Sequence, residues 1–335
     1  MLKLISKIFE WLRGSTLRLL VLAGVILAIW GILSPLGTIV WWLTQSEPLG
    51  SKRQSPQLPA SNDLGAGKLP KNSNCYIVFL TGVGDFSTNE LTEGEEVFLQ
   101  GLAQTHQGCA IVKDVFPYSA ANENLGGERL LAPVWRFANQ AEGWLSIADV
   151  LIKIRNLWRF AISADERYGP VYNQGIASAI ADQMNAVHPV SQTSKPLKII
   201  LIGTSGGAQV ALEATPYLNQ WLNSQIIVVS IGGVFGGING FDQADQIFHL
   251  RGTNDWIEDV GGIIFPSRWV FTFASPFSRA RQQGRYQAEI SGPHEHDGSQ
   301  GYFGRNQVQG SNTTYVDLTL EAINQLPIWQ QRDRK

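Results

Sequence analysis

The sequence predicts an α/β fold, in which a mostly parallel sheet is covered by helices on both faces. Short apolar, β-branched runs alternate with amphipathic helical patterns from Cys75 onward, as they do in such folds. One of these runs, 197–202, passes through the tight turn Gly203–Gly207 directly into a helical pattern. The chain has 335 residues, enough for one large domain of this class plus further segments.

The individual elements follow from this alternation of patterns. We place the strands at 75–81, 109–115, 197–203, 226–231, 246–251 and 286–291. The helical patterns outside the long insertion described below lie at 90–105, 174–188, 206–221 and 314–325.

An apolar segment at 19–43 precedes the domain and contains no charged residue. As a helix, its 25 residues would reach about 37 Å, enough to cross a bilayer core of about 30 Å. The segment therefore predicts a transmembrane anchor, with Trp41 and Trp42 at the far interface. A cleavable signal peptide is the alternative, but its apolar core is normally shorter and the exit offers only a weak cleavage site.

The charges around this segment predict its orientation. Four basic residues precede it, Lys3, Lys7, Arg13 and Arg18, whereas Lys52 and Arg53 follow it. By the positive-inside rule, residues 1–18 stay in the cytoplasm and the rest of the chain is exported. We therefore expect a single-pass membrane protein whose folded domain lies on the extracytoplasmic side.

Two further segments are set apart by their composition. Residues 44–74 are rich in Ser, Pro, Gln, Asn, Gly and Lys, and we interpret them as a flexible linker to a domain at 75–327. Within that domain, 119–172 is an insertion with a helical pattern over 131–162, placed where it would overhang the turn as a lid. Its tryptophans and interleaved basic residues suit contact with lipid headgroups, and they equally suit packing onto the core.

The turn at Gly203–Gly207 has the form G-x-S-x-G between a strand and a helix. This is the nucleophile elbow, in which small glycines let the chain turn so sharply that a serine hydroxyl stands clear of the sheet. We therefore interpret Ser205 as a catalytic nucleophile. The alternative is a purely structural turn.

A serine nucleophile needs a base, and the base needs an acid to orient it. Asp255 is our candidate acid because it follows a predicted strand, where active-site loops of α/β sheets arise. The alternative role for Asp255 is turn stabilisation. Glu258 and Asp259 on the same loop, or Asp242 after the preceding strand, are the substitutes.

Two histidines lie beyond this acid, His294 and His296, after the last strand and a Gly-Pro turn. Either can be the base, and the four-residue distance from the strand slightly favours His294. The run His294–Asp297 could instead contribute to a metal site, since imidazole and carboxylate groups suit zinc or iron. We favour a site without metal.

Acyl transfer also requires hydrogen-bond donors aimed at the developing oxyanion. The backbone N–H of Gly206, directly after the serine, is one candidate. The other is the N–H of Val83 in the glycine-rich loop that follows the first strand. This loop has neither a G-x-G-x-x-G pattern nor a P-loop lysine, so we do not interpret it as a phosphate site.

Two cysteines, Cys75 and Cys109, each stand at the start of a predicted strand. If the two strands are parallel neighbours, a disulfide can bridge their starts, as suits an exported domain. The sequence leaves a disulfide and two buried thiols equally open.

From 75 to 327 the chain resembles the α/β-hydrolase superfamily of serine esterases and lipases. The resemblance rests on the glycine loop, the elbow at Ser205, Asp255, and a histidine at 294 or 296, in that order. It implies a central sheet of about eight strands, hydrolysis through an acyl-enzyme, and no cofactor. The chain departs from the family where Thr81-Gly82 replaces the common His-Gly pair, and where no two strands are evident before Cys75.

Together these features predict a membrane-anchored serine hydrolase that cleaves a small-molecule or lipid-like ester or thioester delivered from the bilayer. An acyltransferase on the same triad, a peptidase and a non-catalytic binding protein of the same fold are the alternatives. The net charge of −2 gives no reason to expect a nucleic-acid partner.

Overall fold

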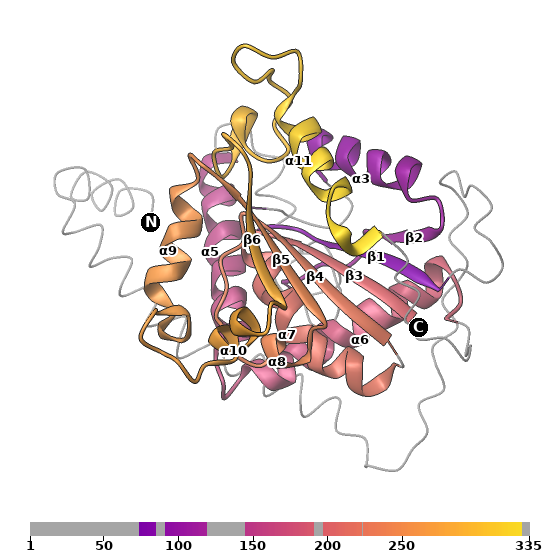
Figure 1. Cartoon of the computed structure of the whole chain (residues 1–335), viewed down its shortest axis with the longest axis vertical. Helices are drawn as coiled ribbons and strands as arrows, with labels where there is room; N and C mark the ends of the chain where they lie inside the picture. Colours follow the sequence, from indigo (N-terminus) through magenta and orange to yellow (C-terminus); the bar gives the residue numbers. More distant parts are fainter. Residues whose placement is uncertain (1–73, 85–90, 119–144, 191–196, 223, 330–335) are drawn as a thin grey trace, which may run out of the picture. The chain divides into compact units, whose positions relative to one another are not determined.

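Six parallel strands form a single sheet at the centre of the structure, a computed structural model that describes residues 74–84, 91–118, 145–190, 197–222 and 224–329 (Figure 1). The strands are β1 Cys75–Leu80, β2 Cys109–Val112, β3 Leu197–Thr204, β4 Ser224–Ile231, β5 Gln246–Gly252 and β6 Tyr286–Gly292. They lie in the order β2-β1-β3-β4-β5-β6, and every neighbouring pair is parallel. The prediction of an α/β fold is therefore confirmed.

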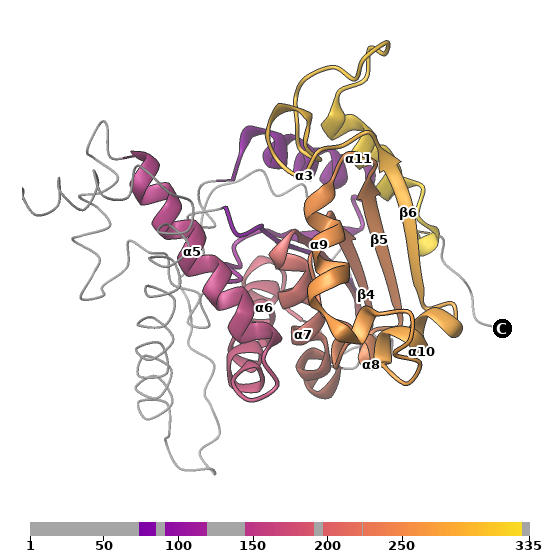
Figure 2. The same cartoon turned by 90° about the vertical axis from the view of Figure 1, so that its left-hand side faces the viewer.

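Helices cover both faces of this sheet (Figures 1 and 2). One face carries α3 Glu93–Thr105 and α11 Tyr315–Asn324, and the other carries α6 Gly169–Val187 and α7 Gly206–Trp221. The remaining described helices are α5 Leu145–Ala164, α8 Gly240–Gln243, α9 Trp256–Ile264 and α10 Pro276–Gln282, with short 3-10 turns at Pro266–Arg268, Gly298–Gln300 and Pro327–Trp329.

Local sequence explains where two of these helices begin. Thr92 and Thr314 each accept a hydrogen bond from the backbone N–H three residues on, and the acidic residue there bonds back to the threonine N–H. Such a capping box satisfies two backbone donors that the first helical turn leaves without partners. It fixes the starts of α3 and α11, close to the predicted positions.

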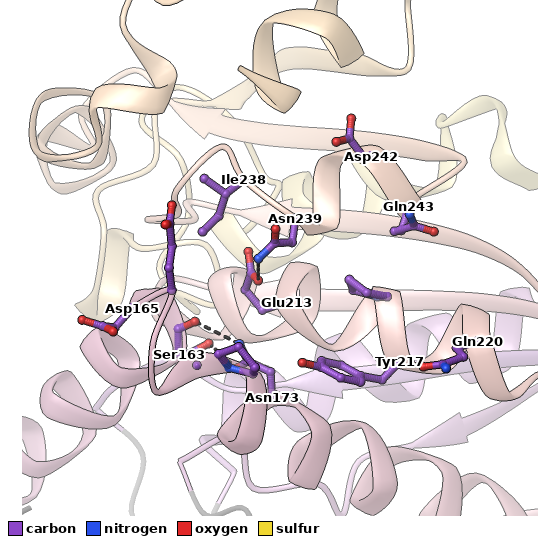
Figure 3. A pocket seen from close by; sticks show the side chains of 14 residues that line it. Ser163, Asp165, Asn173, Glu213, Tyr217, Gln220, Ile238, Asn239, Asp242 and Gln243 are labelled. Atoms are coloured by element: carbon purple, nitrogen blue, oxygen red, sulfur yellow. Dashed lines mark hydrogen bonds between the residues drawn. The ribbon is translucent and has the colours of Figure 1, made fainter. Parts of the chain in front are cut away.

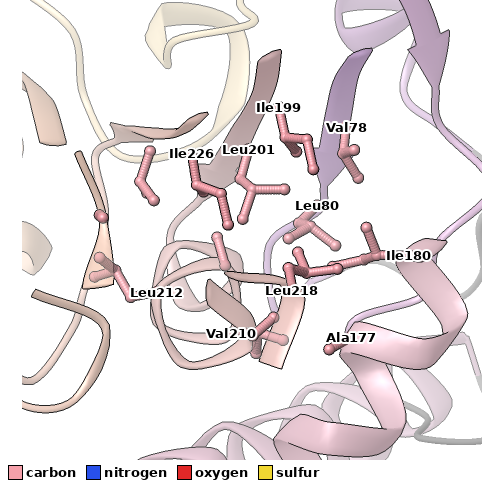
Figure 4. Packing of buried hydrophobic residues seen from close by; sticks show 14 of the residues in the cluster. Val78, Leu80, Ala177, Ile180, Ile199, Leu201, Val210, Leu212, Leu218 and Ile226 are labelled. Atoms are coloured by element: carbon pink, nitrogen blue, oxygen red, sulfur yellow. The ribbon is translucent and has the colours of Figure 1, made fainter. Parts of the chain in front are cut away.

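The core consists of two apolar layers, one on each side of the sheet. Successive residues of one strand alternate between them: Ile199 and Leu201 pack with α6 and α7, whereas Ile200 and Ile202 pack with α3 and α11. Figure 4 shows the first layer, where Leu80 and Leu201 meet Val210 of α7 and Ile180 of α6. Burial of both faces explains why these strands read as continuous apolar runs in the sequence.

The strand registers bring several loops to one edge of the sheet. Leu80 pairs with Gly203, Thr204 with Ile231, Ile231 with Leu250, and Gly252 with Gly292, so all five of these strands end close together. The glycine loop, the elbow, the loop after β4, the Asp255 turn and the histidine segment therefore begin at the same edge, where open α/β sheets bind ligands.

A disulfide joins the first two strands. Cys75 and Cys109 are direct partners in the parallel register, with Cα atoms 4.4 Å apart, and their sulfurs are bonded. Of the two alternatives that the sequence left open, a disulfide and two buried thiols, the structure contains the disulfide. The link ties β2, a strand at the edge of the sheet, to β1.

Several predicted segments lie outside the described residues: the apolar span 19–43, the linker up to residue 73, and residues 119–144 of the insertion. Of the helices that are described, none is long and apolar enough to cross a membrane. The described part of the predicted insertion, 145–172, forms α5 and the first turn of α6, and the second half of α5 is part of the core, with Phe160 and Ile162 buried.

Candidate active site

The turn between β3 and α7 holds Ser205 in an unusual backbone conformation. Its φ is 48° and its ψ is −124°, and no other non-glycine residue in the described part of the chain has a positive φ. This region is sparsely populated by residues that have a Cβ atom, so the surrounding packing must hold it in place. The serine side chain is thereby presented at the carboxyl edge of the sheet.

The two outer glycines of the motif are required by space. A Cβ atom on Gly203 would lie 2.5 Å from the Cα of Ala208, and one on Gly207 would lie 2.4 Å from the carbonyl oxygens of Leu80 and Thr81. Both distances are far below van der Waals contact, so the start of α7 can approach β1 and β3 this closely only without side chains. The G-x-S-x-G pattern therefore has a packing reason on each side of the serine.

A chain of hydrogen bonds runs from this serine to a buried carboxylate. Nε2 of His296 lies 2.9 Å from Oγ of Ser205, and Nδ1 of the same ring lies 3.0 Å from both carboxylate oxygens of Asp255. This is the arrangement that lets an imidazole take the serine proton while the carboxylate holds the ring in the required tautomer. Of the predicted candidate residues, the structure brings Ser205, Asp255 and His296 together.

Asp255 is held by its own helix. It is the N-cap of α9, and its Oδ1 accepts hydrogen bonds from the backbone N–H groups of Ile257 and Glu258. Burial by itself raises the pKa of Asp255, but its hydrogen bond to His296, the charge of that ring and a bond from Tyr302 outweigh this effect. The net result is a pKa below the usual value, so the group stays ionised at neutral pH.

The ring of His296 experiences the opposite balance. Burial lowers its pKa, whereas the hydrogen bond and the negative charge of Asp255 raise it by more, so the pKa lies above its ordinary value. A base in this state accepts the serine proton more readily than an isolated imidazole does.

His294 occupies a different position from the one that the sequence slightly favoured. Its ring is fully buried and stacks on Tyr302, with centroids 4.8 Å apart, and it also meets the edge of Tyr315. Gly292, at φ 147°, ends β6, and the chain then turns so that His294 points into the core and His296 reaches Ser205. The preference for His294 is not matched by this geometry.

The substitute acids have other partners. Glu258 is buried and bonds His249, Arg251 and Arg268. In the same region Asp259 pairs with Arg251, whereas Asp242 pairs with Arg279 on another part of the surface. None of the three is bonded to a histidine of the 294–296 segment.

The glycine loop after β1 lies against the elbow. A Cβ atom on Gly82 would be 3.4 Å from that of Ser205, and one on Gly206 would be 2.8 Å from the side chain of Val83. The carbonyl of Val83 is held by the side-chain amide of Asn156 on α5, at 2.9 Å. The two predicted oxyanion donors, the N–H groups of Val83 and Gly206, thus belong to neighbouring backbone segments beside the serine.

An apolar cluster adjoins the same loop. Phe116, Tyr118 and Phe160 are buried together, and Val83, Val234 and Phe265 pack against them. Phe160 and Tyr118 also limit the space around Gly206. One side of the serine is therefore lined by aromatic and aliphatic groups, which suits an apolar acyl group.

Tyr302 is a site residue that the sequence did not indicate. Its hydroxyl donates a hydrogen bond of 2.9 Å to Oδ2 of Asp255 and accepts one of 2.7 Å from the N–H of Gly252. It stands 47 residues from Asp255 in the sequence, and no motif surrounds it.

The predicted alternative of a metal site at 294–297 has no donor cluster to support it. No group of three or more His, Cys, Asp or Glu side chains in the described ranges is arranged to hold a metal ion. Both ring nitrogens of His296 face Ser205 and Asp255 instead.

A separate polar pocket of about 310 Å³ lies on the outer side of α7, away from the elbow (Figure 3). Glu213, two helical turns beyond Ser205, projects toward it from α7, and Asn173 and Tyr217 stand on its wall. Neither Ser205 nor its partners line this pocket, so it is not part of the serine site.

No protein-family model, curated protein or solved structure matches the chain.

Proposed function

We propose that this chain is a serine hydrolase that cleaves an ester or thioester through an acyl-enzyme formed on Ser205. The observation that carries the proposal is the unbroken hydrogen-bond chain from Oγ of Ser205 through His296 to Asp255. The sequence resemblance to the α/β-hydrolase superfamily points to the same chemistry, since the three residues follow one another in the order of that family.

The residues would act as follows. Oγ of Ser205 attacks the acyl carbon while Nε2 of His296 takes its proton, and Asp255 stabilises the imidazolium that results. The tetrahedral intermediate collapses when His296 returns the proton to the leaving alcohol or thiol. A water molecule, deprotonated by the same ring, then releases the acid and restores the serine.

The oxyanion of each intermediate would lie between the N–H groups of Val83 and Gly206. Removal of one such donor typically lowers kcat by about 10²–10³. Asn156 supports this role indirectly, because its amide holds the Val83 carbonyl and thereby fixes the loop.

The apolar surroundings favour a lipid-like acyl group. The cluster of Phe116, Tyr118 and Phe160 lies beside the glycine loop, and the predicted span at 19–43 would keep the domain at a bilayer. We therefore propose a membrane-anchored enzyme with its domain on the extracytoplasmic side, acting on esters that partition into lipid.

The test is labelling of the detergent-solubilised full chain with a fluorophosphonate, followed by mass spectrometry of the modified peptide. We expect a stoichiometric adduct on Ser205. Ser205→Ala and His296→Ala should lose the adduct, whereas the matched change Ser311→Ala, at an exposed serine far along the chain, should keep it. A folded protein that forms no adduct would contradict the proposal and favour a non-catalytic binding role.

Product analysis separates the two acyl-transfer reactions that the site can support. With an activated ester and an added alcohol, a hydrolase releases the free acid. An acyltransferase would instead yield the acylated alcohol as the main product.

A further inference from the structure

Large apolar side chains are exposed directly after Asp255, on α9 and on the segment that follows it to residue 273. Val270 is 84% exposed and Phe273 is 73% exposed, values rare for such residues in a soluble domain. We call this set the α9 surface, and its exposed members are Trp256, Ile263, Ile264, Trp269, Val270, Phe271 and Phe273.

Contacts within the segment bring most of these side chains into one patch. Ile263, Trp269, Val270 and Phe271 line one shallow groove together with Gly262 and the stem of Arg268. The rings of Trp269 and Phe271 lie 5.2 Å apart, and the indole N–H of Trp269 donates to the carbonyl of Ile263. The loop is thus folded back onto the end of α9.

The α9 surface has almost no charge that would have to be dehydrated. Residues 260–274 contain all of its members except Trp256, and their only charged residue is Arg268, whose side chain is 9% exposed. Its guanidinium lies 4.3 Å from the centroid of the Phe235 ring and pairs with the buried Glu258. The charge is therefore turned inward. Asp259, three residues after Trp256 on α9, is exposed and pairs with Arg251.

Two polar side chains of the segment are already bonded within it. The Trp269 indole N–H uses the Ile263 carbonyl, and the Thr272 hydroxyl donates to the carbonyl of Pro266 at 2.7 Å. Transfer of such a surface out of water breaks few hydrogen bonds, so the gain from its apolar area is not offset by unsatisfied donors.

We propose that the α9 surface inserts into a lipid bilayer, at the boundary between headgroups and acyl chains. The apolar face of an amphipathic segment, with its aromatic and aliphatic side chains, is buried about 5–10 Å into this zone. The occupant is indicated by the chain itself, because the uncharged segment 19–43 predicts an anchor in the same membrane.

The predicted linker is compatible with this docking. Residues 44–74 number 31, and a chain of that length that behaved as the predicted flexible linker would have a root-mean-square span of about 30 Å. A domain tethered so closely meets the bilayer at high effective concentration, so even a modest apolar surface is held against it.

The position of the surface gives the docking a consequence. Asp255 caps the helix that carries Trp256 and Ile263, and Phe265 at its end packs on Phe160, with ring centroids 6.1 Å apart. Phe160 in turn borders Gly206 at the elbow. Docking itself does not depend on the chemistry of Ser205, whereas delivery of a lipid ester to that serine rests on the proposed function.

The experiment places a nitroxide on the full chain, reconstituted in vesicles of phosphatidylcholine and phosphatidylglycerol. Both native cysteines are in the disulfide, so Val270→Cys provides a single reactive thiol, and Gln309→Cys provides a matched exposed control. Collision rates of each label with oxygen and with a water-soluble nickel chelate are then measured. We expect the oxygen-to-nickel ratio to be several-fold higher at 270 than at 309.

A second change tests whether the apolar surface itself causes the difference. In the Val270→Cys protein, Phe273→Glu should return the ratio toward that of the control position, because the bilayer disfavours the new carboxylate. Phe273 is exposed, so this change leaves the core intact. The companion Gln307→Glu, at another exposed position, should leave the ratio unchanged.

Two results would overturn the proposal. Equal ratios at 270 and 309 would show that the surface stays in water. Low collision rates with both reagents at 270 would show that protein covers it, either a second copy or another part of this chain. The oxygen-to-nickel ratio at position 270 should be the same in the Ser205→Ala protein as in the protein with its native serine. A failure of docking can therefore be distinguished from a failure of the proposed chemistry.

Discussion

The hydroxyl of Tyr302 donates a hydrogen bond of 2.9 Å to Oδ2 of Asp255, the oxygen that the α9 backbone leaves free. The acid is thereby held from two sides, by its helix through Oδ1 and by a tyrosine from the loop after β6 through Oδ2. The same hydroxyl accepts from the N–H of Gly252, which fixes the ring on the strand that leads to the acid.

We expect Tyr302→Phe to lower kcat by about tenfold, because a hydrogen bond to a charged group contributes about 1.5–3 kcal/mol and part of it orients Asp255. KM should change little, since the hydroxyl is buried behind the acid. Steady-state kinetics on a soluble ester would check this. Tyr315→Phe is the matched control, because that ring also meets His294 but its hydroxyl bonds Gln300. An equal loss in both variants would contradict a specific role for Tyr302.

The pH profile should report the pKa of His296. The base acts in its neutral form, so kcat/KM should rise with pH through a pKa that lies above 6.5. Asp255→Asn removes the hydrogen bond and charge that raise this pKa and leaves burial, which lowers it. We therefore expect the residual activity, reduced by about 10⁴, to level off at a lower pH than in the unmodified protein. A midpoint that stays in place would show that Asp255 does not set the pKa of the base.

Substitution of the two neighbouring histidines should separate chemistry from packing. His296→Ala should abolish turnover with little loss of stability, because its ring lies at the serine. His294→Ala should instead lower the melting temperature, because its fully buried ring fills the space beside Tyr302 and Tyr315. Labelling by fluorophosphonate and thermal unfolding of both variants would check this. Comparable loss of turnover in the two proteins, with unchanged stability, would contradict the assignment.

The strands and the elbow could be predicted from the sequence because both depend on local patterns. Burial of both sheet faces leaves apolar runs, and the space around Gly203 and Gly207 leaves glycines. Asp255 could also be predicted, because a turn after a strand can be located from its glycine and its polar residues. These features need only a few adjacent residues to be recognised.

The rest depends on contacts between distant residues. The choice between His294 and His296 is made by the turn after Gly292 and by the aromatic rings of Tyr302 and Tyr315, none of which a strand-to-histidine distance can represent. The start of α9 at the acid was not predicted either, since its sequence reads as an apolar loop with two adjacent glycines.

The backbone at Ser205 should make glycine more stable than alanine at this position. Ser205→Ala keeps a Cβ atom at φ 48°, whereas Ser205→Gly removes it from a region that costs about 1–3 kcal/mol for other residues. Glycine also makes the unfolded chain more flexible, which offsets about 0.5–1 kcal/mol of the gain. We expect the free energy of unfolding of the glycine variant to exceed that of the alanine variant by about 1 kcal/mol, as measured by urea titration. The reverse order would show that the turn is not strained.

Glu213 should make the stability of the domain depend on pH in an unusual direction. Its side chain projects from α7 toward the polar pocket of Figure 3, is 4% exposed, and accepts a hydrogen bond of 3.3 Å from the Asn239 amide. Burial raises its pKa to about 7, from an ordinary value of 4.5, despite that bond and one from the Gly240 backbone. The folded protein therefore keeps a proton on Glu213 at pH values where the unfolded chain has released it.

The sign of the effect follows from proton linkage. Between pH 4.5 and about 7 the folded state binds more protons than the unfolded state, so the contribution of this group to stability falls as the pH rises. The Glu213→Gln variant has a neutral side chain at every pH. Its free energy of unfolding should equal that of the native protein near pH 4 and exceed it by about 3 kcal/mol at pH 8. Urea titrations at a series of pH values would measure this difference. A constant difference between Glu213→Gln and the native protein would mean that folding does not shift the pKa of this carboxyl group.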